Sequence, residues 1–336
     1  MVRRVSTQVS NSYTDDPSAP PMLRYQASLP KLPVPTLEST CTKYLETVQP
    51  LLTPDEYSQT KAAITSFLSS PLAAELQKRL KDRAAAPESV SWLIDWWNEI
   101  AYMGYRDPVV VYVSYFFVHM DDKLRRDPAK RAASLIKAMI PFRDLVERCV
   151  IVCHYIRKNN QNSFFSGRLE PEKVKGNPLC MATYKWLFHA SRYPVKPIDT
   201  AAKFDPKVNN HIVVIRKNRF YVVPLADVSG RELSAAELEA QFNTIITLAG
   251  SDKNSPPVGV LTSDNRDRWA DAREALIAAS PSGKNADLLR NIEGAMIIVA
   301  LDDNKPITRE EISWSTWVGD GRNRWYDKHQ RESMNL

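Results

Sequence analysis

The first half of the chain carries apolar residues at helical spacing. Thr53-Pro54-Asp55-Glu56 has the pattern of a capping box with proline at the first helical position. After Ser70-Pro71, Leu72, Leu76 and Leu80 repeat every four residues, which predicts an amphipathic helix. The aromatic-dense stretch 92–105 and the stretch from Pro128 to about Tyr155 favour two more helices. We therefore expect a helical N-terminal region.

The second half contains β-branched and aromatic runs of strand length. The sequence HIVVIRKNRFYVVPL (211–225) predicts a hairpin around Arg216 to Arg219, and 258–262 and 295–301 each predict a short buried strand. Helices are expected from Ser234, over 267–280, and from Thr308, where Glu311 completes a capping box. Strands that alternate with helices favour an α/β fold, a mixed sheet flanked by helices.

The longest apolar run, Val109 to Met120, is much shorter than the ~20 residues of a membrane-spanning helix. A buried strand or a core helix accounts for it. Prolines within 29–35 favour an extended entry, and residues 1–28 are expected to form a disordered tail or a weak mitochondrial presequence. Asp15 and Asp16 argue against the presequence.

Composition places the chain among globular proteins and excludes little else. With 336 residues, 43% of them hydrophobic, it has enough material for one large domain or two ordinary ones. The net charge of +6 is a mild excess. The basic runs at 78–83 and 123–131 are interrupted by Asp82 and Asp127, so they are typical of solvated helix faces. We expect no nucleic-acid partner.

The four cysteines, Cys41, Cys149, Cys153 and Cys180, are too few for a disulfide framework and favour a reducing compartment. Cys149 and Cys153, with His154 beside them, leave a zinc site open. Packing as small hydrophobic residues is the simpler interpretation, because no second Cys/His pair lies nearby in sequence. We expect no metal and no bound cofactor.

Six stretches together resemble one known family. They are LPKLPVPTLEST (29–40), WLIDWWNEIAYMGYRDPVVVY (92–112), GNPLCMATYKWLFHASRYPVKPID (176–199), HIVVIRKNRFYVVPL (211–225), PVGVLTSDNRDRWADAREAL (257–276) and NRWYDK (323–328). In this order they are similar to motifs of the choline/carnitine acyltransferase family, most closely its carnitine O-acetyltransferases. The resemblance departs from the family pattern at Cys41.

The resemblance implies a chloramphenicol-acetyltransferase-like fold of two similar α/β domains, with a strand over RDPVVVY. Residues 29–328 then correspond to the N-terminal acyltransferase domain, the first of the two, and 329–336 to a divergent terminus. The implied activity is reversible acyl transfer between acyl-CoA and the hydroxyl group of carnitine, both of them substrates rather than cofactors.

Such chemistry needs a histidine to deprotonate the alcohol, and donors for the tetrahedral oxyanion. In the family these groups and the coenzyme A surface follow the NRWYDK motif. Here HQRESMNL follows it, so we expect an incomplete domain that is inactive alone. His329 comes too early, and His119, His154, His189 and His211 do not match the family base. A non-catalytic interaction protein or pseudoenzyme that keeps the N-terminal surface is the alternative.

By resemblance, Trp97 and Tyr102 line the carnitine pocket, where an aromatic face suits a trimethylammonium group. The alternative that both residues merely pack in the core remains open. Asn323, Arg324, Trp325, Asp327 and Lys328 are expected to form the scaffold of the site. An exposed domain interface favours self-association. The compartment is open between cytoplasm, mitochondria and peroxisome.

Overall fold

The computed structural model describes residues 13–86, 89–112, 118–120, 122–150, 169–250, 255–315, 322–328 and 331–335. The chain divides into two compact units. The helical unit is Pro30–Ala101, and the sheet unit joins Met1–Leu29 to Tyr102–Leu336.

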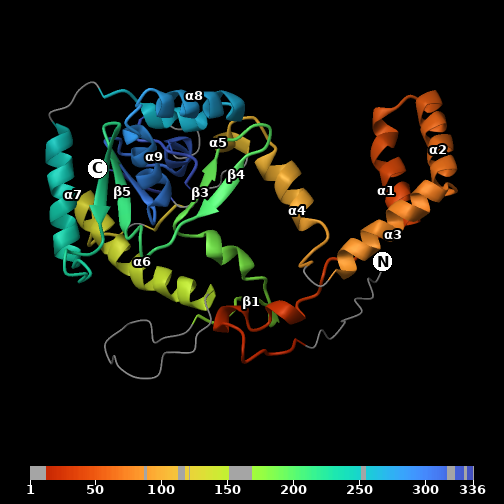
Figure 1. Ribbon diagram of the computed structural model, residues 1–336, viewed down its shortest axis with the longest axis horizontal. Helices are drawn as coiled ribbons and strands as arrows, with labels where there is room; N and C mark the ends of the chain where they lie inside the picture. The colour runs from red at the N-terminus through yellow and green to blue at the C-terminus, as the bar shows by residue number, and fades with distance from the viewer. Residues whose placement is uncertain are drawn as a thin grey trace. The chain divides into compact units, whose positions relative to one another are not determined.

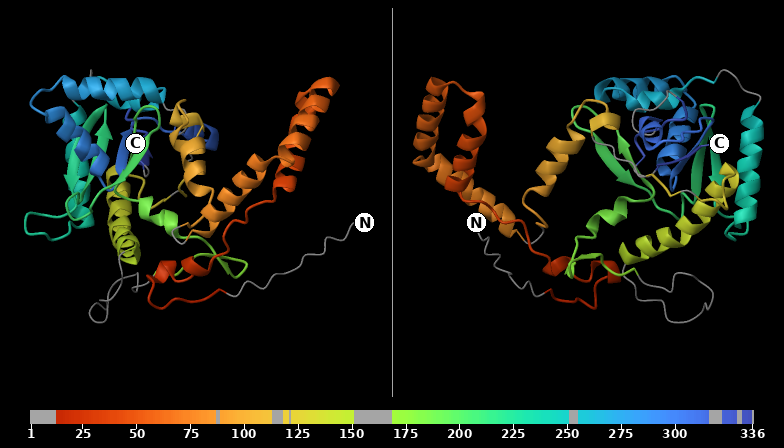
Figure 2. Two further views of the ribbon diagram at one scale, coloured as in Figure 1. Left: turned by 45° about the vertical axis from the view of Figure 1, so that its right-hand side comes forward. Right: turned by 180° about the vertical axis from the view of Figure 1, so that it is seen from behind.

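The helical unit contains the predicted N-terminal helices, and α1 and α2 lie alongside each other (Figure 1, Figure 2). The Thr53 side chain accepts a hydrogen bond from the backbone amide of Glu56, and the Glu56 carboxylate accepts one from the amide of Thr53 at 2.9 Å. The Ser70 side chain caps the following helix by accepting a hydrogen bond from the backbone amide of Ala73 at 3.2 Å. The elements are α1 (Leu37–Val48), η3 (Gln49–Leu51), α2 (Pro54–Leu68), α3 (Pro71–Ala85) and α4 (Ile94–Trp97), after which the π-helix η4 (Asn98–Met103) leads into the sheet unit.

The sheet unit carries the predicted mixture of helices and strands. Its helical elements are η1 (Pro21–Leu23), η2 (Gln26–Ser28), α5 (Val109–Tyr112), α6 (Pro128–Val150), η5 (Ala182–Trp186), α7 (Ala235–Gly250), η6 (Val258–Ser263), α8 (Arg266–Ala278), α9 (Lys284–Gly294) and α10 (Arg309–Ser313). Its strands are β1 (Lys173–Val174), β2 (Asn177–Pro178), β3 (Ala190–Tyr193), β4 (Thr200–Lys203), β5 (His211–Arg216), β6 (Arg219–Pro224), β7 (Ile298–Asp302) and β8 (Arg331–Asn335).

A four-stranded mixed sheet in the order β6-β5-β7-β8 organises this unit. Strands β5 and β6 form the predicted hairpin, whose turn residues Lys217 and Asn218 have φ angles of 48° and 64°. Strands β7 and β8 run parallel to β5. The register places Val213 opposite Val222 of β6 and Ile298 of β7. As in any strand, successive side chains of β5 point to opposite faces of the sheet.

Helices cover both faces of this sheet (Figure 1). One face packs Ile212 and Val214 of β5 against Ile136 of α6 and Phe242 of α7. The other packs Val213 and its neighbours against α8 and α9, with Trp269 at the centre. The near-continuous apolar sequence of β5 and β7 follows from this burial on both sides. The α/β expectation, a mixed sheet flanked by helices, is confirmed at this level.

Two predicted strands are wrong. Residues 258–262 form the 3-10 helix η6, because the segment packs against the chain around Arg324 instead of joining the sheet. A Cβ atom on Gly259 would lie 1.7 Å from the Arg324 carbonyl oxygen.

The strand implied for RDPVVVY instead begins as helix α5, in which Val109 and Val110 are buried. Pro108 precedes it, a residue that suits the start of a helix, and an apolar run alone does not distinguish a strand from a core helix. Within the described parts of the chain, every helix is too short or too polar to cross a membrane.

Candidate functional site

The segment that follows α10 is built into the interior of the sheet unit. Its residues Asn323, Arg324, Trp325, Asp327 and Lys328 are at most 6% exposed. They contact β6, β7, α8 and α9 through hydrogen bonds, ion pairs and aromatic contacts. The structure therefore brings all five predicted scaffold residues together in one buried segment.

Asn323 and Arg324 are held at the carboxyl end of β7. The Asn323 amide nitrogen donates to the Leu301 carbonyl oxygen at 3.0 Å and to the Asp302 carboxylate at 2.9 Å. Arg324 forms an ion pair with Asp302 at 3.0 Å, and both side chains are 2% exposed. Asp302 therefore fixes the entry of the segment.

Trp325 and Asp327 hold the segment against α8. The Trp325 ring makes edge-to-face contacts with Phe220 and Trp269, with centroids 5.7 Å and 6.0 Å apart. The Asp327 carboxylate accepts hydrogen bonds from Arg266 at 2.8 Å and from the Trp269 indole at 2.7 Å. Burial raises the pKa of Asp327, and the Arg266 guanidinium opposes that shift.

Lys328 is a buried amine without a carboxylate partner in the described structure. Its Nζ donates to the backbone carbonyl of Glu293 at 2.7 Å, and the residue is 6% exposed. Burial lowers the pKa of Lys328 to about 7. The Glu293 carboxylate is instead paired with Arg273 at 2.6 Å.

Three arginines surround the carboxylate of Asp199, whose side chain is 0% exposed. Arg192 and Arg266 each donate to Oδ2 at 2.6 Å, and Arg106 donates to Oδ1 at 2.8 Å. Arg266 also reaches Asp327, so the two aspartates belong to one network. Hydrogen-bonded pairing of this kind is what allows charges to be buried.

The network fixes the chain around Tyr102. Arg192 donates to the Tyr102 carbonyl oxygen at 2.7 Å, and the amide of Asp199 donates to the Met103 carbonyl oxygen at 3.0 Å. Arg106 also bonds the Met103 carbonyl oxygen, at 3.3 Å. Tyr102 is 41% exposed, so a tightly held backbone carries a partly exposed tyrosine.

Trp97, the other predicted pocket residue, lies at the end of α4 in the helical unit. It is 51% exposed, so it does not pack in the core of that unit. Core packing was the open alternative for both aromatic residues, and their exposure argues against it.

Sequence reasoning missed Asp199, Arg106, Arg192 and Arg266 as a group. All four lie within stretches that carry the family resemblance: 92–112, 176–199 and 257–276. These three stretches and the NRWYDK motif therefore meet in one buried ionic network. The sequence signal for this network was the presence of charged residues among apolar ones in each stretch. Only the fold shows that these charged residues meet.

The histidines of the described chain are not arranged as a catalytic base. His189 is fully buried, its Nδ1 lies 3.1 Å from the Gly294 carbonyl oxygen, and burial lowers its pKa to about 3. Burial also lowers the pKa of His211, whose Nε2 lies 2.8 Å from the Asn291 carbonyl oxygen. His119 is exposed and lines a surface cavity together with Arg125 and Arg131. His154, His329 and Cys153 lie outside the described residues, as does the side chain of Cys149.

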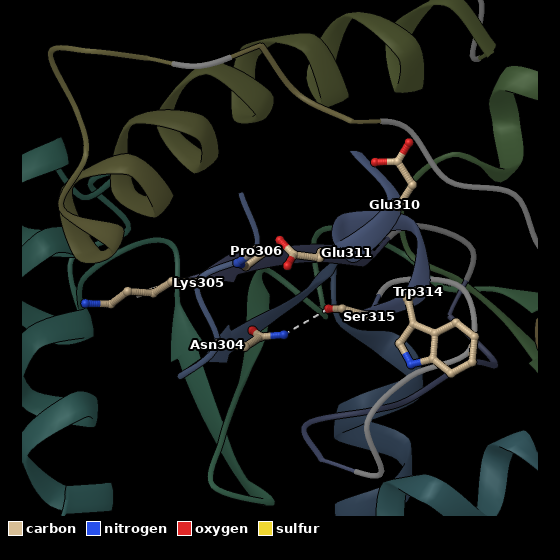
Figure 3. A pocket seen from close by; sticks show the side chains of 7 residues that line it. All are labelled: Asn304, Lys305, Pro306, Glu310, Glu311, Trp314 and Ser315. Atoms are coloured by element: carbon tan, nitrogen blue, oxygen red, sulfur yellow. Dashed lines mark hydrogen bonds between the residues drawn. The ribbon is translucent and has the colours of Figure 1, made fainter. Parts of the chain in front are cut away.

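A separate surface pocket of about 510 Å³ lies between the end of β7 and α10 (Figure 3). The Asn304 amide donates to the Ser315 hydroxyl at 3.0 Å across it. Its walls are Asn304, Lys305, Pro306, Glu310, Glu311, Trp314 and Ser315. Neither Trp97 nor Tyr102 lines it, so this pocket is not the predicted substrate wall.

Comparison with known proteins agrees with the motif resemblance. The family model described as choline/carnitine O-acyltransferase matches residues 32–332. Mitochondrial carnitine O-acetyltransferase of Saccharomyces cerevisiae is 32% identical over 313 residues, which cover 90% of this chain and 43% of the relative.

Two further relatives have different named activities. Mitochondrial carnitine O-palmitoyltransferase 2 of Bos taurus is 31% identical, with 97% of this chain and 50% of the relative covered. Choline O-acetyltransferase of Danio rerio is 31% identical, with 96% and 48% covered. The chain thus spans about half the length of these curated relatives, which differ in both acyl group and acceptor alcohol.

Proposed function

Because the chain belongs to the choline/carnitine O-acyltransferase family, we propose that it takes part in reversible transfer of an acyl group between coenzyme A and the hydroxyl group of carnitine. The match over residues 32–332 carries this proposal. In this proposal residues 29–328 form the acyltransferase portion of the chain. We further propose that the helix-flanked sheet is one of two chloramphenicol-acetyltransferase-like domains, with the reaction in a tunnel between them.

In this proposal Tyr102 contacts carnitine, and Trp97 is the second candidate for a carnitine contact. Both are aromatic and between 41% and 51% exposed, which suits contact with a ligand. An aromatic face attracts a quaternary ammonium group through its negative quadrupole, and the phenol supplies a hydrogen bond for a polar tail. The buried 323–328 segment supports the site from within and takes no part in bond making.

The chemical step needs a base, because an alcohol is a weak nucleophile at neutral pH. A histidine that takes the hydroxyl proton lets the oxygen attack the thioester carbonyl, and the thiolate of coenzyme A leaves. The three histidines within the described ranges do not suit this role, since His189 and His211 bond backbone carbonyls and His119 lies by a separate cavity. We propose that the 336-residue chain alone does not turn over.

The first test measures thiol release from acetyl-CoA by the purified chain, with carnitine or choline as acceptor. The expected rate equals the blank, and the S. cerevisiae relative serves as the active control. Steady turnover by the isolated chain would show that its own residues complete the site, and the inactivity proposal would be wrong.

A second test asks whether the matched region supports the proposed reaction. Residues 32–328 replace the matching part of the S. cerevisiae relative, and acyl transfer is measured with acetyl-CoA and palmitoyl-CoA. We expect transfer to carnitine in preference to choline, and a weaker carnitine response with Tyr102→Phe. A folded chimera that transfers to choline instead would reject carnitine as the acceptor.

A further inference from the structure

Asp199 stands at a junction of four chain segments, and its role extends beyond neutralising one arginine. Its carboxylate receives Arg106, Arg192 and Arg266, and it also accepts from the Val195 amide at 3.2 Å. Arg106 follows η4, Arg192 lies in β3, and Arg266 begins α8. Through Arg266 the junction continues to Asp327 in the 322–328 segment.

We propose that Asp199 is a positioning residue, which holds the Tyr102–Arg106 segment at the candidate substrate wall in register with the 322–328 segment. The inference rests on the proposed function, because Tyr102 is its substrate-facing residue. Asp199 does not touch substrate in this proposal. It acts through Arg192, which bonds the Tyr102 carbonyl oxygen, and through its own amide on Met103.

The geometry explains why a charge is required. Arg192 divides its guanidinium between the Asp199 carboxylate at 2.6 Å and the Tyr102 carbonyl oxygen at 2.7 Å. A planar guanidinium presents its donors in a fixed fork, so the carboxylate sets the direction in which the second donor points. Without the charge, the buried guanidinium groups of Arg192 and Arg266 and the half-buried one of Arg106 repel one another. Arg192 also loses the partner that orients it.

A second buried acid supplies a matched comparison. Asp302 is 1% exposed and binds Arg324 and Asn323. None of its described contacts reaches the Tyr102–Arg106 segment. Loss of either charge destabilises the fold, but only loss of the Asp199 charge is expected to move Tyr102.

The test uses the full chain labelled at tyrosine, with the Tyr102 ring signal assigned by its loss in Tyr102→Phe. Spectra are recorded well below the unfolding temperature. In Asp199→Asn the Tyr102 signal is expected to shift or broaden, whereas Asp302→Asn leaves it unchanged. Arg192→Lys keeps the charge but loses the fork, so it should move Tyr102 as well, and it serves if Asp199→Asn does not fold.

An unmoved Tyr102 signal in Asp199→Asn or Arg192→Lys overturns the proposal. An equal shift in Asp302→Asn also overturns it, because the shift would then reflect a general loosening of the fold. The readout is structural and needs no turnover. If acyl transfer fails in the chimera while Tyr102 moves as expected, the proposed function is wrong and the positioning role of Asp199 stands.

Discussion

The buried amine of Lys328 is expected to contribute a stability that rises with pH. Its pKa is lowered to about 7 by burial, from 10.5 for an ordinary lysine. Between these two values the unfolded chain binds more protons than the folded chain, so the free energy of unfolding increases with pH. Integrating over pH 6 to pH 9 gives about 2 to 3 kcal/mol for this residue alone.

Substitution of Lys328 by Met removes the titrating group and keeps a side chain of similar length. The variant loses the hydrogen bond to the Glu293 carbonyl oxygen, a cost of about 1–3 kcal/mol that does not depend on pH. We therefore expect the stability of the variant, relative to wild type, to fall by about 2 to 3 kcal/mol as pH rises from 6 to 9.

Urea denaturation followed by circular dichroism at pH 6, 7.5 and 9 measures this difference. Lys207→Met is the control, since Lys207 is exposed and its replacement should shift the curve equally at every pH. If wild type and Lys328→Met change in parallel across the range, the amine is not desolvated in solution and the reasoning fails.

Three further substitutions test the buried contacts. Gly259→Ala places a Cβ atom 1.7 Å from the Arg324 carbonyl oxygen and should cost about 3 kcal/mol or more in thermal unfolding, whereas Gly250→Ala, with nothing within 4 Å, should be tolerated. Equal melting temperatures for the two variants would refute the close approach. Thr53→Ala removes the cap of α2 and should cost about 1 kcal/mol in the same assay; no loss would mean that α2 does not depend on its cap. Asp302→Asn leaves a buried arginine without its carboxylate and should cost about 3–5 kcal/mol in urea, so a loss below about 1 kcal/mol would show the pair to be dispensable.

The helix starts and the hairpin could largely be predicted from the sequence. Thr53, Ser70, Ser234 and Thr308 each start a helix where the pattern predicted one, since a capping side chain bonds amides only three residues away. The hairpin at 211–225 could be predicted because its two strands and its turn are adjacent in sequence.

The sequence also identified the family, because six matching stretches in the same order are more specific than any single motif. It identified 323–328 as a scaffold without showing what the segment packs against. The buried residues of this segment are Asn323, Arg324, Trp325, Asp327 and Lys328, all polar or aromatic. Their burial depends on partners distant in sequence: Asn323 bonds Asp302 and Asn218, which lie 21 and 105 positions away.

Only the tertiary structure decided where the charges meet. Asp199 and its three arginines are spread from residue 106 to 266, and their convergence depends on the packing of β3, α8 and the segment after η4. The same packing turned 258–262 from a predicted strand into a 3-10 helix, because the Arg324 backbone occupies the space beside Gly259. Caps and hairpins are set by neighbours in sequence, whereas buried ion pairs and close backbone contacts are set by neighbours in space.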